Sequence, residues 1–106
     1  MKTESALEKI LAAGHLAVTS ECGPPRGAVP EKVREKAEML RNHVDAINVT
    51  DNQTAIVRMC SLAASHFAVQ AGVEPVMQMT CRDRNRLAQQ SDMLGAAALG
   101  VRNILC

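Results

Sequence analysis

Three short segments of the chain are rich in apolar or β-branched residues and end in threonine. They span residues 16–19, 47–50 and 76–80. Their final threonines are 31 and 30 residues apart, the length of a strand followed by a crossover helix. The spacing therefore predicts three parallel strands, and the apolar residues from Val101 to Cys106 indicate a fourth.

The segments between these strands repeat their apolar residues with the period of a helix. Pro30 suits the first turn of a helix over residues 30–42. Residues 54–71 predict a second helix and residues 84–99 a third, while a shorter helix over residues 5–13 precedes the first strand. The inward faces expected for the three main helices are Val33, Ala37 and Leu40, then Ile56, Met59, Cys60, Ala63 and Phe67, then Leu87, Leu94 and Ala98.

This alternation of helices and strands predicts an α/β protein with a parallel sheet. One face of the strands is apolar and should meet the helices, whereas the other face is polar near the carboxyl ends. A sheet covered by helices on both sides would be apolar on both faces, so the lumen of a (β/α)₈ TIM barrel fits better. The apolar face is Leu16, Val18, Ile47, Val49, Met77 and Met79, and the polar face is Thr19, Glu21, Asn48, Thr50, Gln78 and Thr80.

The chain of 106 residues is under half the length of a complete barrel, which takes about 250 residues. We therefore expect a half-barrel with the first three to four β/α units, formed as one domain over residues 1–106. Such a chain is the front of a longer barrel, or it needs a partner to close the sheet.

Composition and charge exclude several classes of function. The chain has 12 Lys and Arg against 11 Asp and Glu, and its one aromatic residue is Phe67. A net charge of +1 and the lack of stacking side chains argue against nucleic-acid binding. No apolar run approaches the roughly 20 residues of a membrane span, and the first ten residues do not resemble a secretory signal. We expect a cytoplasmic protein with reduced cysteines and no membrane contact.

Glu21 is the most informative candidate for chemistry, since a rigid loop of two glycines and two prolines follows it. A carboxylate at the mouth of a barrel could act as a general acid. The simpler and commoner alternative is a glutamate that bonds to loop amides or to Arg26. Asp51 and Gln53 follow the second strand, where such residues either cap a helix or present polar groups to a ligand. Gln78, a polar group within the sheet, needs a ligand or a neighbouring side chain as its partner.

Two further clusters leave alternatives open. Cys22, Cys81 and Cys106 follow the carboxyl ends of strands, but no CxxC pair exists, so a metal site is the less favoured interpretation. Three arginines between residues 82 and 86 open the third helix, where a solvated surface is commoner than an anion site.

Three motifs, taken together, resemble a known family. Residues 18–27, 44–53 and 74–85 are similar to the first three strand–loop units of methylenetetrahydrofolate reductase, most closely the bacterial branch of anaerobes. The resemblance implies a (β/α)₈ barrel that carries FAD and passes a hydride from the reduced flavin to 5,10-methylenetetrahydrofolate, yielding 5-methyltetrahydrofolate. It also implies NADH or NADPH as the electron donor.

The same resemblance implies roles for single residues. Glu21 would protonate the folate so that its five-membered ring opens, and Thr50 would lie near the nicotinamide and the flavin. Asp51 and Gln53 would contact FAD, although many members have an aromatic residue at the position of Asp51. Gln78 stands where many members have a histidine beside the flavin.

The family members continue past the fourth strand, with an aspartate that lies by the flavin. We therefore expect the isolated chain to bind FAD weakly or not at all and to be inactive, and we expect a homo-oligomer or a partner reductase subunit. The rival hypothesis is a non-catalytic, reductase-like module that pairs with a partner chain.

Overall fold

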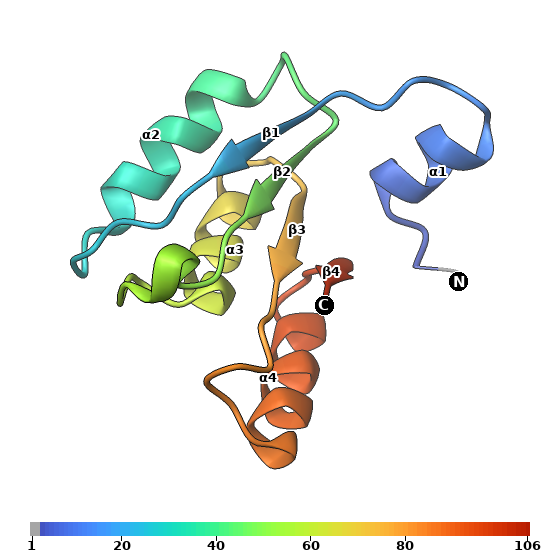
Figure 1. Ribbon diagram of the computed structural model, residues 1–106. Coiled ribbons are helices and arrows are strands. Elements are labelled where there is room, and N and C mark those ends of the chain that lie inside the picture. The colour runs from blue at the N-terminus through green and yellow to red at the C-terminus, as the bar shows by residue number, and fades with distance from the viewer. Residues whose placement is uncertain (1–2) are drawn as a thin grey trace.

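Four parallel strands form one sheet in the order of the sequence, and helices precede or join them. The computed structural model describes residues 3–106. The order of elements is the predicted one (Figure 1). The strands are β1 (Thr19–Cys22), β2 (Ala46–Val49), β3 (Pro75–Gln78) and β4 (Asn103–Leu105), and the helices are α1 (Ala6–Ala12), α2 (Pro30–Leu40), α3 (Ser61–Gln70) and α4 (Arg86–Ala98).

The packing between helices and sheet forms two adjoining apolar clusters. Ile47 and Val49 of β2 lie fully buried against Val33 and Ala37 of α2, so the predicted inward stripe of α2 is confirmed. Met77 of β3 is buried in the second cluster beside Ala96 of α4. The apolar face of β2 and β3 therefore meets the helices, as the alternation predicts, and gives the α/β architecture of a partial TIM barrel.

The first strand lies three residues later than predicted. Pairing with β2 begins at Thr19, which lies opposite Ala46. One residue earlier, the amide of Val18 donates to the Asp45 carboxylate, and the amide of Asp45 donates to the carbonyl of Val18. Leu16 is 89% exposed, and Cys22 takes the helix-facing position that was expected for Leu16 and Val18. The short apolar run therefore misled the prediction, because only pairing with β2 fixes where this edge strand begins.

The predicted helix over residues 54–71 is wrong in its first part. A single 3₁₀ turn, η1 (Gln53–Ala55), is followed by extended chain, and α3 begins only at Ser61. The extended chain is held because the amide of Met59 donates to the carbonyl of Pro25 at 2.8 Å. Ile56 and Cys60 are consequently exposed, and the buried face of α3 is Ser61, Ala64, Ser65 and Ala68.

Helix α4 has nearly the predicted bounds, but it turns a different face inward. Leu87 and Leu94 are 73% and 75% exposed, whereas Ala96 is fully buried. Ala96 is buried in the second apolar cluster with Met77 and Val101, which defines the inward side of the helix. Asp92 lies one turn earlier on the same side, where it is 3.4 Å from Arg84.

Helix α1 stands apart from the other helices, at the right of Figure 1, and none of its residues is buried. The side chain of Ser5 caps the helix by accepting from the amide of Glu8, and the amides of Ala6 and Leu7 donate to the Glu74 carboxylate at 2.7 and 2.9 Å. Glu74 immediately precedes β3, and it also accepts from Asn103 of β4 at 2.9 Å. One carboxylate therefore fastens α1 to the amino-terminal end of the sheet.

Candidate functional site

The polar face of the sheet gathers the candidate residues at the carboxyl ends of the strands. Glu21 pairs in register with Asn48, and Thr50 and Gln78 continue the same face one step further along their strands. Helices cover the opposite face, so these side chains lie where the lumen of a barrel would be. The predicted polar face is confirmed, with Glu21 placed inside β1 rather than after it.

Glu21 is exposed and takes part in none of the ion pairs of residues 3–106. The alternative in which Arg26 binds its carboxylate is therefore not what the structure contains. Asn48, the strand neighbour, donates instead to the hydroxyl of Thr19 at 3.3 Å. The Glu21 carboxylate is left accessible to a molecule on the polar face, which a proton donor requires.

Thr50 and Gln53 come together next to Gly23, and the space that Gly23 leaves between them will be called the recess. Thr50 is 5% exposed, and its buried hydroxyl has no hydrogen-bond partner. A Cβ on Gly23 would lie 3.8 Å from that hydroxyl and 3.7 Å from the Gln53 amide nitrogen. Because a buried hydroxyl without a partner is costly, this recess is a place where a ligand atom would complete the bonding.

Asp51 does not face this recess, because its side chain is fully buried by other contacts. Arg84 forms two parallel hydrogen bonds with its carboxylate, one of them at 3.0 Å. The amide and hydroxyl of Thr80 donate to the same carboxylate at 2.9 and 3.1 Å. The carboxylate thus fixes the loop after β2 to the segment after β3, and this arrangement leaves it no direct contact with a ligand.

These contacts control the ionisation of Asp51. Burial acts to raise the pKa of its carboxyl, but the hydrogen bonds from Arg84 and Thr80 outweigh burial, so the pKa lies below the ordinary value. Asp51 is therefore a charged group near neutral pH. Sequence reasoning missed Arg84 as its partner, and the one available signal was the run of arginines that begins at Arg82.

The loop after β2 is rigid although it lacks glycine. Asn52, Thr54 and Ala55 all adopt positive φ angles, of 44°, 60° and 57°, which non-glycine residues rarely do. The side chain of Asn52 accepts from the amide of Arg58 at 2.8 Å and holds this shape. A strained conformation that persists because its surroundings fix it is common at binding sites, and here it places Gln53 beside Thr50.

Gln78 is half-buried on the polar face, and its backbone carbonyl accepts from the hydroxyl of Ser61 at 2.7 Å.

The cysteines do not support the metal-site alternative. Cys22 is buried on the helix side of the sheet, whereas Cys81 and Cys106 are exposed. Within residues 3–106, no three His, Cys, Asp or Glu side chains are grouped to hold a metal ion.

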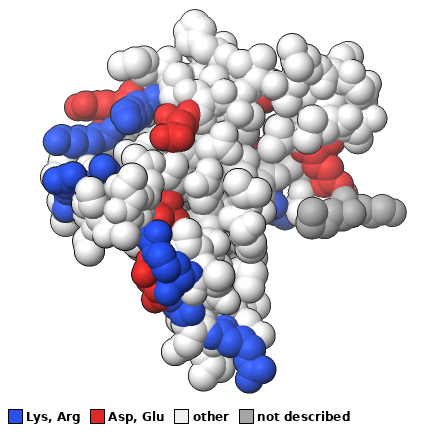
Figure 2. Space-filling view, viewed as in Figure 1, with Lys and Arg blue, Asp and Glu red and all other residues white. Residues whose placement is uncertain are grey.

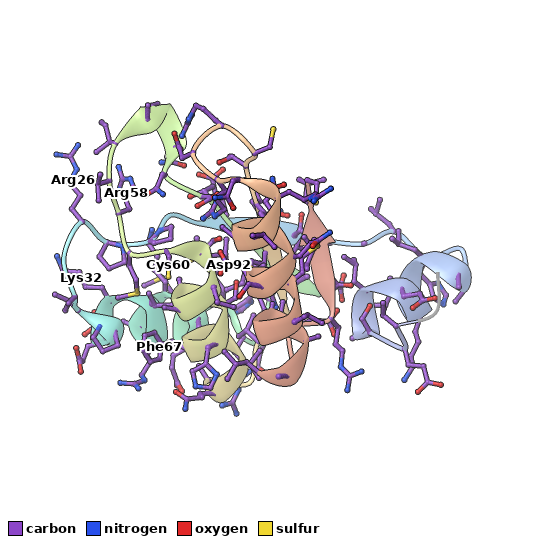
Figure 3. The ribbon with its side chains drawn as sticks, turned by 90° about the horizontal axis from the view of Figure 1, so that it is seen from below. Arg26, Lys32, Arg58, Cys60, Phe67 and Asp92 are labelled. Atoms are coloured by element: carbon purple, nitrogen blue, oxygen red, sulfur yellow. The ribbon has the colours of Figure 1, made fainter. Side chains whose placement is uncertain are left out.

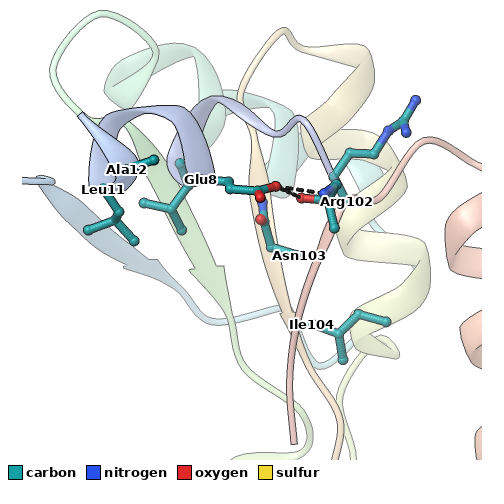
Figure 4. Close-up of a pocket in the computed structure, with 8 residues that line it drawn as sticks. Glu8, Leu11, Ala12, Arg102, Asn103 and Ile104 are labelled. Atoms are coloured by element: carbon teal, nitrogen blue, oxygen red, sulfur yellow. Dashed lines mark hydrogen bonds between the residues drawn. The ribbon is translucent and has the colours of Figure 1, made fainter. Parts of the chain in front are cut away.

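A cavity also lies at the other end of the molecule. It has a volume of about 690 Å³ and opens between α1 and β4, where Leu11, Ala12 and Ile104 surround it (Figure 4). Its position at the amino end of β4 separates it from the carboxyl ends, where barrel enzymes carry their active sites. We therefore do not assign the chemistry to this cavity.

Comparison with known proteins agrees with the geometry. No helix in residues 3–106 is long and apolar enough to cross a membrane. No curated protein gives a significant match. The family model for methylenetetrahydrofolate reductase matches residues 6–106, a range that contains every helix and strand and all five candidate residues. The chain therefore belongs to the methylenetetrahydrofolate reductase family.

Proposed function

We propose that the chain serves the flavin-dependent reduction of 5,10-methylenetetrahydrofolate to 5-methyltetrahydrofolate in one-carbon and methionine metabolism, with NADH or NADPH as electron donor. Family membership supports an oxidoreductase acting on folate. The observation that carries the finer proposal is that two groups lie on the same polar face. One is the accessible carboxylate of Glu21, and the other is the unpartnered hydroxyl of Thr50.

The residues of this face fit a flavin. The Thr50 hydroxyl and the amides of Gln53 and Gln78 provide neutral donors and acceptors, which suit the edge of an isoalloxazine ring. Gly23 leaves open the space next to Thr50 that a side chain would enter. Asp51 serves the same site by holding the loop that carries Gln53. Bound FAD would supply hydride transfer.

Glu21 is the proposed general acid. Its place on the polar face, beside Asn48, allows it to donate a proton to the folate so that the five-membered ring opens to an electrophilic iminium. Glutamine at this position would keep the size of the side chain and lose the transferable proton. We also propose that a second copy of the chain or a reductase subunit adds to the edge strands β1 and β4 and so completes the sheet.

The test uses the native polypeptide from its source and separates the two half-reactions. With Glu21→Gln we expect folate reduction to fall by at least about 100-fold, while reduction of the flavin by NADH or NADPH is retained. Glu35→Gln is the matched control, because Glu35 is exposed on α2. Unchanged folate reduction in Glu21→Gln would remove this residue from the mechanism. A stable oligomer without flavin would instead support the non-catalytic module.

A further inference from the structure

A second hollow lies on the outer side of the loop between β1 and α2. It has a volume of about 350 Å³ and will be called the basic pocket. Its charged lining residues come from three separate segments and are all cations. Figure 3 shows Arg26, Lys32 and Arg58 along one side of the molecule. The basic pocket is lined by Gly23, Pro24, Pro25, Arg26, Lys32, Lys36 and Arg58.

The walls of the basic pocket are fixed by contacts between two loops. Arg58 donates from Nη1 to the carbonyl of Pro24 at 3.1 Å, and its own amide is held by Asn52. The next amide, at Met59, donates to the carbonyl of Pro25. Because Pro24 and Pro25 have no N–H groups and restricted φ angles, this part of the wall is stiff and offers no backbone donors. The charged groups that could hold an anion in the pocket are the side chains of its four cations.

The positive charges of the basic pocket are not neutralised by the protein. Of the ion pairs formed within residues 3–106, none includes Arg26, Lys32, Lys36 or Arg58. The Nε of Arg58 is buried and has no hydrogen-bond partner. Figure 2 shows Lys and Arg side chains gathered at the left, over the start of α2. In a chain of net charge +1, such a concentration of cations without ion-pair partners attracts an external anion.

We propose that the basic pocket binds the phosphate group of a small ligand. A phosphate presents oxygens in several directions and can be reached by cations from three segments, whereas a planar carboxylate is satisfied by one arginine. The volume is ample for a phosphate or a pyrophosphate. Gly23 is shared with the space next to Thr50, but none of the four cations of the basic pocket is among the proposed flavin and folate residues.

The test is calorimetric titration of the purified chain with inorganic pyrophosphate, which needs neither flavin nor folate. We expect binding that weakens as salt is raised, because charge attraction drives it. Lys32→Gln and Lys36→Gln should each weaken binding roughly five- to tenfold, and the double variant should abolish it. Both lysines are exposed on α2, so these changes leave the core intact. Lys9→Gln, which removes the same charge from α1, is the control.

Two comparisons sharpen the result. Citrate should bind at least about tenfold more weakly than pyrophosphate, and equal binding would overturn the assignment to phosphate. If FAD displaces pyrophosphate, the cofactor is the source of the phosphate group. If FAD does not displace it, the phosphate group belongs to a separate ligand. No binding of pyrophosphate, or equal weakening by Lys9→Gln, would overturn the proposal. Each of these results is independent of reductase activity, so failure of one proposal leaves the other standing.

Discussion

Asp51 and Arg84 form a two-pronged ion pair that connects the carboxyl ends of β2 and β3. The carboxylate is fully buried and the arginine side chain is 14% exposed. Arg84 also donates to the carbonyl of Thr80 at 3.1 Å and lies near Asp92 of α4. One side chain therefore contacts two neighbouring loops and the helix that follows them.

Replacing Asp51 with asparagine should destabilise the chain by about 3 kcal/mol, because the mostly buried Arg84 would lose the closer of its two carboxylate partners and keep only the longer contact with Asp92. The measurement is urea denaturation followed by circular dichroism. The matched control is Asp83→Asn, which makes the same chemical change in the exposed pair between Arg82 and Asp83. The control should change the free energy of unfolding by less than about 0.5 kcal/mol. Equal effects of the two substitutions would show that burial of the pair does not matter.

The same pair gives a pH dependence with a definite sign. The pKa of Asp51 is lower in the folded chain than its ordinary value of 3.8, so its contribution to stability is complete above that pH. The contribution is lost as the pH falls below 3.8 and through the folded pKa. We expect the stability difference between wild type and Asp51→Asn to be constant at neutral pH and to shrink in acid. A stability difference between the two proteins that grows as the pH falls would contradict the lowered pKa of Asp51.

Thr50→Val tests the recess next to Gly23. Because the Thr50 hydroxyl is buried without a partner, valine should leave the stability of the cofactor-free chain unchanged or raise it by about 1 kcal/mol. In the native polypeptide, the same change should weaken flavin retention. Ser65→Ala is the control, since Ser65 on α3 also has a buried, unpartnered hydroxyl but lies away from the polar face. It should leave flavin retention unaltered. An equal loss in both variants would point to a general effect on folding.

Two substitutions in α4 distinguish the observed helix face from the one that the sequence predicts. Leu94→Ala should change the free energy of unfolding by less than about 0.5 kcal/mol, because Leu94 is 75% exposed. Ala96→Leu should cost about 1–3 kcal/mol, because Ala96 is fully buried and no space exists for three more carbons. Thermal unfolding of both variants gives the comparison. A larger loss of stability in Leu94→Ala than in Ala96→Leu would instead support the helix face predicted from the sequence.

The fold could be predicted from the sequence wherever local pattern and long-range pairing agree. The predicted bounds of β2 and β3 agree with the structure within one or two residues, because their apolar side chains alternate and each strand is paired at both of its edges. The edge strand β1 was misplaced because Leu16 and Val18 have a strand pattern without a packing partner. The loop before α3 was read as helix because nothing local shows that Pro25 would bind the amide of Met59.

The candidate site, like the fold, could be predicted from the sequence only in part. Glu21, Thr50 and Gln78 share a face because strand alternation and register, both visible in the sequence, determine it. The partnership of Asp51 with Arg84 joins residues 33 positions apart, and no periodic pattern reports such a pair. The four cations of the basic pocket are equally scattered along the chain, apart from the helical spacing of Lys32 and Lys36.

The attachment of α1 through Glu74 has a consequence for the order in which the chain folds. A helix of seven residues is unstable alone, and α1 has no buried residue to hold it in place. Its carboxylate cap is 67 and 68 residues away, and the cap itself is oriented by Asn103. Because both Glu74 and Asn103 belong to the region of β3 and β4, α1 gains this support only once these two strands have paired.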